Sequence, residues 1–373
     1  GGEVTVAKDA TDDITCTFTN AAQRGTIIVV KNIDGVLDSE FGFTGDWTDG
    51  VTPTTDFTVE TDGLTGMVTF TDVLVPKDGS PYSVEETITG TDYDATSVTC
   101  ADTDGGSGPD GSTTLPLVGS IDLDDGETVT CTFTNTEKAK IIVVKDAQPD
   151  SAAEFDFEGD LGEFTLVDDG SGTANDQEST LLDARADATY TVTELPTPGW
   201  TLDTATCTGA DGFDLNGSAL TVDVTPGVTA TCTFVNTANP AGLTATKAVR
   251  GVEGAWGPFT FTLSGGTFTG DAAQDVDSAD PVGQWTSLVE GATYTIVENE
   301  VPGYETGAEF TCTLIDPNEP NDPVALVDGS TDAGFQFTAV AGGIFSCDIT
   351  NVAIPADVSV VKTVAGVAGT QAW

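Results

Sequence analysis

The sequence predicts an all-β protein built as a tandem array of similar domains, and three observations predict it. A strand with Cys, then Phe or Ile, then Asn at alternate positions recurs at residues 16–20, 131–135, 232–236 and 347–351. Side chains two apart on a strand share a face, so these three residues point together into a core. A new apolar run soon follows each of these strands, and no segment keeps a helical period.

Opening strands that end in lysine mark where each domain begins, at residues 26–31, 139–145, 243–247 and 357–362. We expect residues 1–21 to hold the closing strand of a truncated upstream domain, and residues 354–373 to hold the opening strand of a truncated downstream domain. Between them we expect three complete domains, named repeat 1 (22–136), repeat 2 (137–238) and repeat 3 (239–353). The linkers are only a few residues long, and two of them contain proline, which limits the swing between successive domains.

The charge balance excludes several classes of partner. The chain has 11 Lys and Arg residues against 61 Asp and Glu residues, and a net charge of -50 repels nucleic acid and anionic membranes. It has no histidine, which removes the commonest general base and the usual zinc ligands. It also lacks a P-loop and any apolar run of about 18 residues. We therefore expect no ordinary enzyme, no nucleic-acid partner and no direct membrane insertion in this segment.

Six of the seven cysteines form pairs within the repeats, each with one mid-domain member and one in the closing strand. The left-over Cys16 occupies a closing-strand position, so its partner is expected upstream of Gly1. A regular disulfide framework implies an oxidising, extracytoplasmic compartment, whereas buried free thiols are the alternative interpretation. The expected pairs are Cys100 with Cys131, Cys207 with Cys232, and Cys312 with Cys347.

Each repeat also places a lysine, a glutamate and an asparagine at positions that face the core. The glutamate ends a strand with Tyr, an aliphatic residue and Glu at i, i+2 and i+4. A buried carboxylate without a partner is costly, and the lysine of the opening strand can provide that partner. The predicted sets are Lys31, Glu86 and Asn135; Lys145, Glu194 and Asn236; and Lys247, Glu298 and Asn351.

These three residue types can react with one another when they are buried. Burial favours the neutral, nucleophilic amine of lysine and the protonated carboxyl of glutamate. The carboxyl group can polarise the Asn side-chain carbonyl and relay protons while the amine attacks and ammonia leaves. Glu86, Glu194 and Glu298 are thus the expected catalytic residues of a single self-reaction that forms a Lys–Asn amide. The alternative is a buried Lys–Glu ion pair with Asn as a hydrogen-bond partner.

The strand motifs resemble the prealbumin-like, Cna B-type (SpaA-like) repeats of pilins and stalks on Gram-positive cells. The resemblance rests on the opening lysine, the Tyr-to-Glu strand, the Pro-Gly-aromatic turns at residues 198–200 and 302–304, and the closing Asn. It implies β-sandwiches with reversed immunoglobulin-like topology and an intramolecular isopeptide bond in each repeat. Repeat 1 departs from the pattern because residues 88–93 replace the turn. The added cysteine pairs resemble actinobacterial members of the family.

The predicted function is that of an extracellular, cell-surface structural protein: a stalk, an adhesin extender or a pilus-like filament subunit stiffened by disulfides and Lys–Asn bonds. Expected partners are neighbouring copies of the chain or other surface components, and no cofactor is expected. The alternative is an array that binds calcium or a glycan through acidic loops such as 102–117 and 315–325. A glycoside hydrolase with two carboxylates ranks third.

Overall fold

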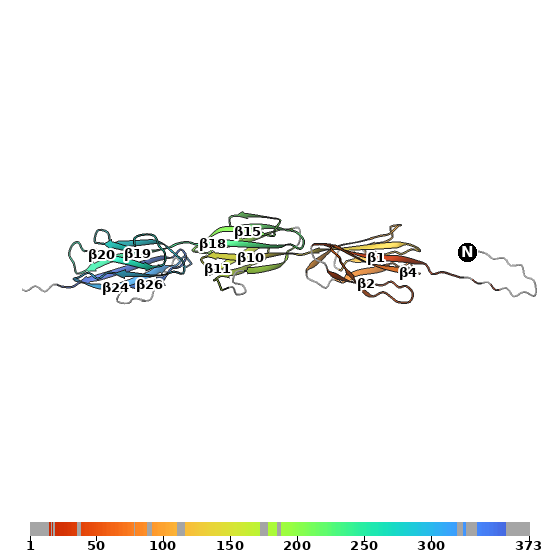
Figure 1. Ribbon diagram of the computed structural model, residues 1–373, viewed down its shortest axis with the longest axis horizontal. Helices are drawn as coiled ribbons and strands as arrows, with labels where there is room; N and C mark the ends of the chain where they lie inside the picture. The colour runs from red at the N-terminus through yellow and green to blue at the C-terminus, as the bar shows by residue number, and fades with distance from the viewer. Residues whose placement is uncertain are drawn as a thin grey trace, which may run out of the picture. The chain divides into compact units, whose positions relative to one another are not determined.

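The computed structural model describes residues 15, 17, 19–35, 39–77, 79–87, 92–109, 116–171, 178–184, 188–318, 324–325 and 334–355. This part of the chain consists of β-strands joined by turns and loops (Figure 1). It contains no helix, and hence none with the length and apolar character needed to cross a membrane. The predicted all-β class is confirmed. Cys16 and the opening strand expected at 357–362 lie outside the described residues.

Each repeat contributes two sheets, and the one that contains the opening and closing strands is called the opening sheet. In repeat 1 the opening sheet has the order β4-β1-β9-β6, and the second sheet has the order β3-β2-β5-β8-β7. The strands of the opening sheet are β4 (Thr65–Leu74), β1 (Arg24–Asp34), β9 (Thr128–Glu137) and β6 (Tyr93–Ala101). Those of the second sheet are β3 (Asp56–Glu60), β2 (Glu40–Gly45), β5 (Tyr82–Thr87), β8 (Val118–Ile121) and β7 (Gly108–Pro109).

Repeat 2 has an equivalent strand order, β13-β10-β18-β15 in the opening sheet and β12-β11-β14-β17-β16 in the second sheet. The strands of its opening sheet are β13 (Glu178–Ala184), β10 (Ala139–Gln148), β18 (Thr229–Ala238) and β15 (Trp200–Thr208). Those of its second sheet are β12 (Phe164–Asp168), β11 (Ser151–Gly159), β14 (Ala188–Glu194), β17 (Ala219–Val224) and β16 (Gly212–Asn216).

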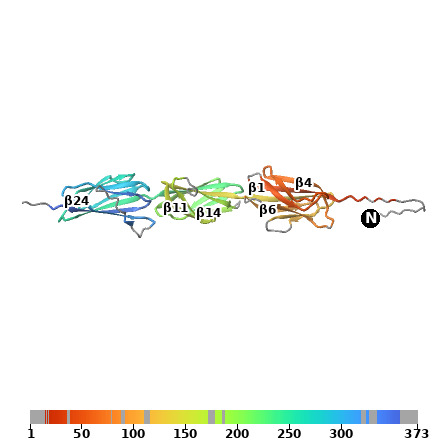
Figure 2. The same ribbon diagram turned by 90° about the horizontal axis from the view of Figure 1, so that it is seen from below.

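Repeat 3 repeats the plan with a short extra strand, in the orders β22-β19-β27-β24-β25 and β21-β20-β23-β26. The strands of its opening sheet are β22 (Val282–Leu288), β19 (Ala241–Arg250), β27 (Ile344–Ala353), β24 (Tyr304–Ile315) and β25 (Val324–Ala325). Those of its second sheet are β21 (Ala273–Val276), β20 (Phe259–Gly265), β23 (Thr293–Glu298) and β26 (Phe335–Thr338). Figure 2 shows the strands of the three repeats from a second direction.

The first and last strands of a repeat are parallel neighbours. In repeat 1, Lys31 of β1 lies opposite Phe133 of β9, and Asn135 lies opposite Ile33. In repeat 3, β19 and β27 pair in the same way. Two strands that are distant in sequence are thereby hydrogen-bonded side by side, with the closing Asn two residues beyond the level of the lysine. The N-terminal end of the first strand and the C-terminal end of the last lie at opposite ends of the pair.

The two sheets of a repeat enclose one apolar core. β1 alternates buried and less buried side chains along its length, which is the period-2 pattern of a strand with one face inward. The core of repeat 1 joins Ile27 and Val29 of β1 to Phe43 of β2 and Phe133 of β9, so it takes residues from both sheets. The core of repeat 3 is built in the same way. Each repeat is therefore a β-sandwich, as predicted.

Candidate cross-linking site

The opening strand, a middle strand of the second sheet and the closing strand position the three predicted site residues of each repeat. The lysine lies on β1, β10 or β19, the glutamate on β5, β14 or β23, and the asparagine on β9, β18 or β27. All nine side chains belong to the interior, with exposed fractions between 0% and 7%. Strand alternation places them inward, and the parallel pairing brings the lysine and the asparagine together.

In repeat 1, Glu86 contacts both of its predicted partners. The Lys31 Nζ lies 3.3 Å from each carboxylate oxygen of Glu86. The Asn135 Nδ2 donates a hydrogen bond of 2.7 Å to the Glu86 Oε1. The Asn135 Oδ1 is buried without a hydrogen-bond partner. The carboxylate thus bridges the amine and the amide, and the carbonyl oxygen of the amide is still open to a donor.

Repeat 3 has the same arrangement. The Lys247 Nζ lies 3.0 Å from the Glu298 Oε1, and the Asn351 Nδ2 donates to the same oxygen at 3.1 Å. The second carboxylate oxygen, Glu298 Oε2, is buried without a partner. The amine also lies 3.5 Å from the backbone oxygen of Ile349, on the closing strand.

Repeat 2 brings the same residue types together in a different order. The Lys145 Nζ donates to the Asn236 Oδ1 at 3.0 Å and to the backbone oxygens of Phe234 and Asp146 at 3.0 and 3.1 Å. The Asn236 Nδ2 in turn donates to the Glu194 Oε1. The amide here lies between the amine and the carboxylate. The lysine is already on the carbonyl side of the asparagine, which is the side on which a bond would form.

Burial moves the pKa values in the direction that the predicted reaction needs. Desolvation lowers the pKa of Lys31 to about 8 against the opposing attraction of Glu86, and it lowers the pKa of Lys145 to about 8. It lowers the pKa of Lys247 as well. Desolvation raises the pKa values of Glu86 and Glu194. In repeats 1 and 2, a neutral amine therefore becomes accessible near neutral pH, beside a carboxyl group that holds its proton more tightly than usual.

An aromatic ring lies against each of these lysines, and the sequence analysis missed it. The Nζ atoms of Lys31, Lys145 and Lys247 lie 4.6, 4.2 and 4.7 Å from the ring centroids of Phe41, Phe155 and Phe259. Each of these phenylalanines begins a Phe-x-Phe pattern on the second strand of its repeat. That pattern is visible in the sequence, but its meaning depends on which ring faces the lysine.

A second aromatic residue packs edge-on against each of these rings. The partners are Tyr93, Trp200 and Tyr304, with centroids 5.3, 5.3 and 5.1 Å from Phe41, Phe155 and Phe259, respectively. Trp200 and Tyr304 belong to the Pro-Gly-aromatic turns, and Tyr93 has the same contact in repeat 1. Repeat 1 therefore keeps the aromatic residue although its sequence departs from the turn motif.

The three expected disulfides are present: Cys100–Cys131, Cys207–Cys232 and Cys312–Cys347. Each joins the closing strand to β6, β15 or β24, which is its neighbour on the side away from the opening strand. The disulfide thus ties the closing strand to one neighbour, and in repeat 2 the hydrogen bond from Lys145 to Asn236 ties it to the other.

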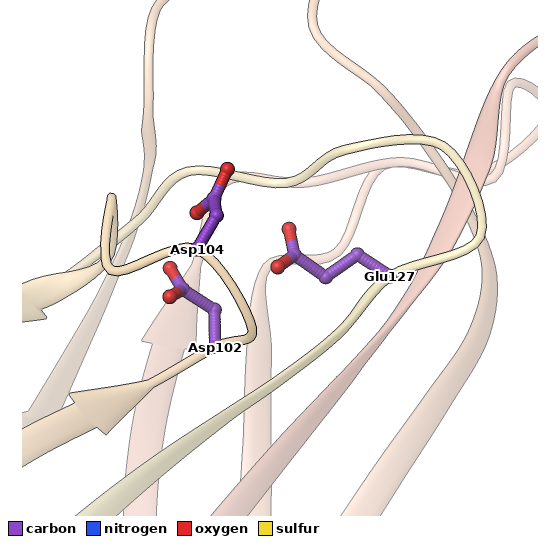
Figure 3. Close-up of side chains that lie close together, drawn as sticks. All are labelled: Asp102, Asp104 and Glu127. Atoms are coloured by element: carbon purple, nitrogen blue, oxygen red, sulfur yellow. The ribbon is translucent and has the colours of Figure 1, made fainter.

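Three carboxylates of repeat 1 lie close together at one end of the strands (Figure 3). The ligand atoms of Asp102, Asp104 and Glu127 lie within 4.8 Å of one another, and theirs is the one such group among the described residues. Glu127 accepts hydrogen bonds from Thr103 and from the backbone of Asp124. Asp102 and Asp104 belong to the acidic loop 102–117 of the calcium alternative, whereas Glu127 lies outside that loop. The oxygens of Glu127 already accept hydrogen bonds from neighbouring groups of the protein.

The class of the chain is that of a β protein built from repeated two-sheet sandwiches. Each sandwich has its first and last strands side by side, a buried Lys–Glu–Asn set and an internal disulfide. The model of the prealbumin-like fold domain matches residues 27–137 and 141–238, which together make up more than half of the chain. The chain belongs to this family of prealbumin-like fold domains. The predicted family and fold are thereby confirmed.

Several solved structures are similar to the chain. The Bacillus anthracis TIE protein is 15% identical, over 89% of this chain and 50% of that chain, with a TM-score of 0.34. The pilus adhesin SpaC from Lactobacillus rhamnosus GG is 15% identical, over 89% and 44%, with a TM-score of 0.28. Two B repeat units of the collagen binding protein of Staphylococcus aureus are 17% identical, over 88% and 76%, with a TM-score of 0.18. The chain spans about half the length of the first two proteins. No curated protein sequence matches it.

Proposed function

We propose that the chain is part of an extracellular structural protein of the cell surface, such as a stalk, an adhesin extender or a pilus-like filament. We further propose that each repeat at residues 22–136, 137–238 and 239–353 is an independent domain closed by a Lys–Asn isopeptide bond in addition to its disulfide. One observation carries this proposal: in all three repeats Lys on the first strand, Asn on the last strand and Glu on the second sheet are buried next to one another.

The proposed reaction balances without any added reagent. The neutral lysine amine attacks the carbon of the Asn side-chain amide, and a new C–N bond forms. The glutamate carboxyl group protonates the carbonyl oxygen, and the resulting carboxylate takes a proton from the attacking nitrogen and passes it to the leaving nitrogen. As the carbonyl group re-forms, its oxygen returns the first proton to the carboxylate. The old C–N bond then breaks, and ammonia leaves. Glu86, Glu194 and Glu298 end the reaction in the state in which they began it.

Before the Lys–Asn bond forms, buried oxygens without hydrogen-bond partners destabilise the site and so favour the reaction. The Asn135 Oδ1 and the Glu194 Oε2 are buried without hydrogen-bond partners. An unsatisfied buried polar group costs about 1–3 kcal/mol. A protonated Glu86 can donate to the Asn135 Oδ1, and the same hydrogen bond makes the amide carbon a better electrophile. The arrangement that relieves the unpaired oxygen is therefore also the one that activates the amide.

The strand order explains why such a bond suits a protein under tension. Force along a tandem chain enters a repeat at its first strand and leaves at its last. Because β1 and β9 are parallel neighbours, that force shears the hydrogen bonds between them. A bond between Lys31 and Asn135 would carry the force directly from one strand to the other. The disulfide cannot do this, since it joins β9 to β6.

Intact mass of the reduced and alkylated chain tests the proposal. The expected result is a mass lower than the calculated one by three ammonias, because each repeat loses one. Glu86→Gln should restore one ammonia relative to its own calculated mass. The matched control is Glu85→Gln, on the outward side of the same strand, which should leave the deficit unchanged. A wild-type mass equal to the calculated mass would contradict the isopeptide bonds.

Calcium or glycan binding stays the alternative. The specific observation in favour of calcium is the carboxylate group formed by Asp102, Asp104 and Glu127. Carboxylate oxygens are the ligands that calcium prefers. Saturable binding of calcium that Asp104→Asn abolishes would favour this alternative for repeat 1. Such calcium binding would not bear on the proposed cross-linking of the three repeats.

A further inference from the structure

The turn that carries the Pro-Gly-aromatic motif of repeat 2 contacts repeat 3. Gly199 lies in this turn with a φ of +82°, and its backbone packs against the backbone of Ala341 and Gly342. A Cβ added at Gly199 would lie 2.3 Å from the Ala341 oxygen, so a residue with a side chain does not fit there. These residues belong to the same compact unit of the chain. The proposed cross-links do not use this contact.

The residue that links the two repeats is hydrogen-bonded to both sides of the contact. Asn239 donates its backbone N–H to the Gly199 oxygen at 2.8 Å, and its own backbone oxygen accepts from the Gly342 N–H at 2.7 Å. Pro240 is the one other residue between β18 and β19, and its ring fixes φ. The connection between the two sandwiches therefore has little freedom to rotate.

A side-chain contact joins the same two repeats. The Ser151 Oγ of β11 donates a hydrogen bond of 3.4 Å to the Glu290 Oε1 of repeat 3. Glu290 also accepts from the backbone of Ala341, in the turn that contacts Gly199. Desolvation raises the pKa of Glu290, as expected for a carboxyl group that is enclosed where two surfaces meet. The contact thus combines backbone packing with a side-chain hydrogen bond.

Repeat 3 builds the same turn, and there the turn is open. Gly303 has a φ of +93° and accepts a hydrogen bond of 2.8 Å from the Ile354 N–H, as Gly199 does from Asn239. Both donors are the third residue after the closing Asn of their repeat. Apart from the adjoining residues, no atom of the described part of the chain lies within 4 Å of a Cβ added at Gly303. Ile354 is 53% exposed, which is unusual for a large apolar side chain.

The sequence after this open turn matches the linker between repeats 2 and 3. Residues 354–356 read Ile-Pro-Ala, and residues 239–241 read Asn-Pro-Ala. Lys362 follows Ile354 at the same spacing at which Lys247 follows Asn239. An equal spacing, with proline at the same place, brings the start of a following domain to the same distance from the turn.

We propose that the turn around Gly303 is the docking surface for a further domain of the same fold, which contacts it as repeat 3 contacts the turn of repeat 2. The occupant presents the turn that precedes its closing strand. Each repeat has a glycine with positive φ in that turn, at Gly126, Gly227 and Gly342. Such a contact selects its partner by backbone shape and by the absence of side chains. The inference does not depend on the Lys–Asn bonds.

Residual dipolar couplings of the 373-residue chain test the occupied turn. Domains joined by small contacts usually move independently, whereas the couplings of repeats 2 and 3 should fit one common alignment. Gly199→Ala places a Cβ against the Ala341 oxygen, so the common alignment should be lost. Gly303→Ala is the matched control, because it has the same positive φ but no neighbour to meet. It should keep the common alignment, and circular dichroism verifies the folding of both variants.

An extended chain tests the open turn. A second copy of residues 242–353 is added after Ala356, and only this copy is isotopically labelled in one sample. Its couplings should fit the alignment of the repeat 3 that precedes it, and Gly303→Ala in that repeat should now abolish the fit. Independent alignment of repeats 2 and 3 in the wild-type chain would overturn the proposal at its basis. An added copy that aligns independently, or that stays aligned in Gly303→Ala, would overturn it for the open turn.

Discussion

Among the described residues, three lysines are buried inside the sandwiches. Each lies against an aromatic ring and beside carbonyl or carboxylate oxygens. The sequence predicted their inward direction from strand alternation, and it predicted Glu and Asn as their partners. It could not predict that Lys145 contacts Asn236 whereas Lys31 contacts Glu86, because side-chain rotamers decide between these contacts. Phe41 was missed for a similar reason, since its distance from Lys31 depends on the spacing of two sheets.

Stability should rise with pH in a chain that cannot cross-link. The variant with Asn135, Asn236 and Asn351 replaced by alanine lacks the electrophile. Because the pKa of folded Lys31 is about 8 and its unfolded value is 10.5, the unfolded chain binds more protons between these pH values. The free energy of unfolding should therefore increase from pH 8 to 10.5, by about 1–3 kcal/mol for Lys31 and for Lys145. Urea titrations measure it, and adding Lys31→Met should remove the contribution of repeat 1.

Phe41 should act as a positioning residue for Lys31. Phe41→Leu removes the ring that faces the amine, so the rate of ammonia loss from repeat 1 after refolding should fall roughly tenfold. Its dependence on pH should also shift, because the environment of the amine changes. Phe43→Leu is the control, since Phe43 packs on Phe133 and not on the lysine. If both variants slow the reaction equally, Phe41 has only a structural role.

At the scale of the strand, the closing pattern with its alternating Cys, Phe and Asn predicted the disulfides and the inward face. The sequence did not show that β1 and β9 are parallel neighbours, because their pairing depends on contacts about 100 residues apart, which periodicity cannot report. The family resemblance supplied the topology. Only the sheet order shows that the closing strand lies between the opening strand and the strand that carries the other cysteine.

Pulling single molecules by their ends should separate the roles of the two bonds. With its Lys–Asn bond in place, repeat 1 should show no unfolding step, since force passes from β1 to β9. Glu86→Gln should restore the step. Reducing the disulfide in that variant should lengthen the step by about 11 nm, because 31 residues at about 3.6 Å each are released. An ordinary unfolding step in the wild-type repeat would contradict the proposed bond.

For the whole molecule, composition decides how the chain behaves in solution. A net charge of -50 with 11 basic residues is an extreme balance, and it predicts repulsion from nucleic acid and anionic membranes before any fold is considered. Composition could not show that the acidic residues avoid the middle of the outer face of the opening sheet in repeat 1. That distribution requires the register of four strands.

Screening of the repulsion between carboxylates by salt should stabilise the folded chain. Raising NaCl from 0.05 to 1 M shortens the range of repulsion between carboxylates that folding brings together, so the free energy of unfolding should rise by at least about 1 kcal/mol. Urea unfolding at each salt concentration measures this. Calcium chloride at equal ionic strength is the control. A much larger effect of calcium, lost in Asp104→Asn, would indicate specific binding at the carboxylates of repeat 1.

The pairing of first and last strands also determines when a repeat can fold during its synthesis. A repeat cannot complete its opening sheet until its final strand has been made, so β1 waits without its parallel neighbour while residues 35–127 follow it. Such an apolar run is prone to pair with other chains during that interval. The acidic segments made next keep nascent copies apart. Each repeat can then fold before the next closing strand has left the ribosome.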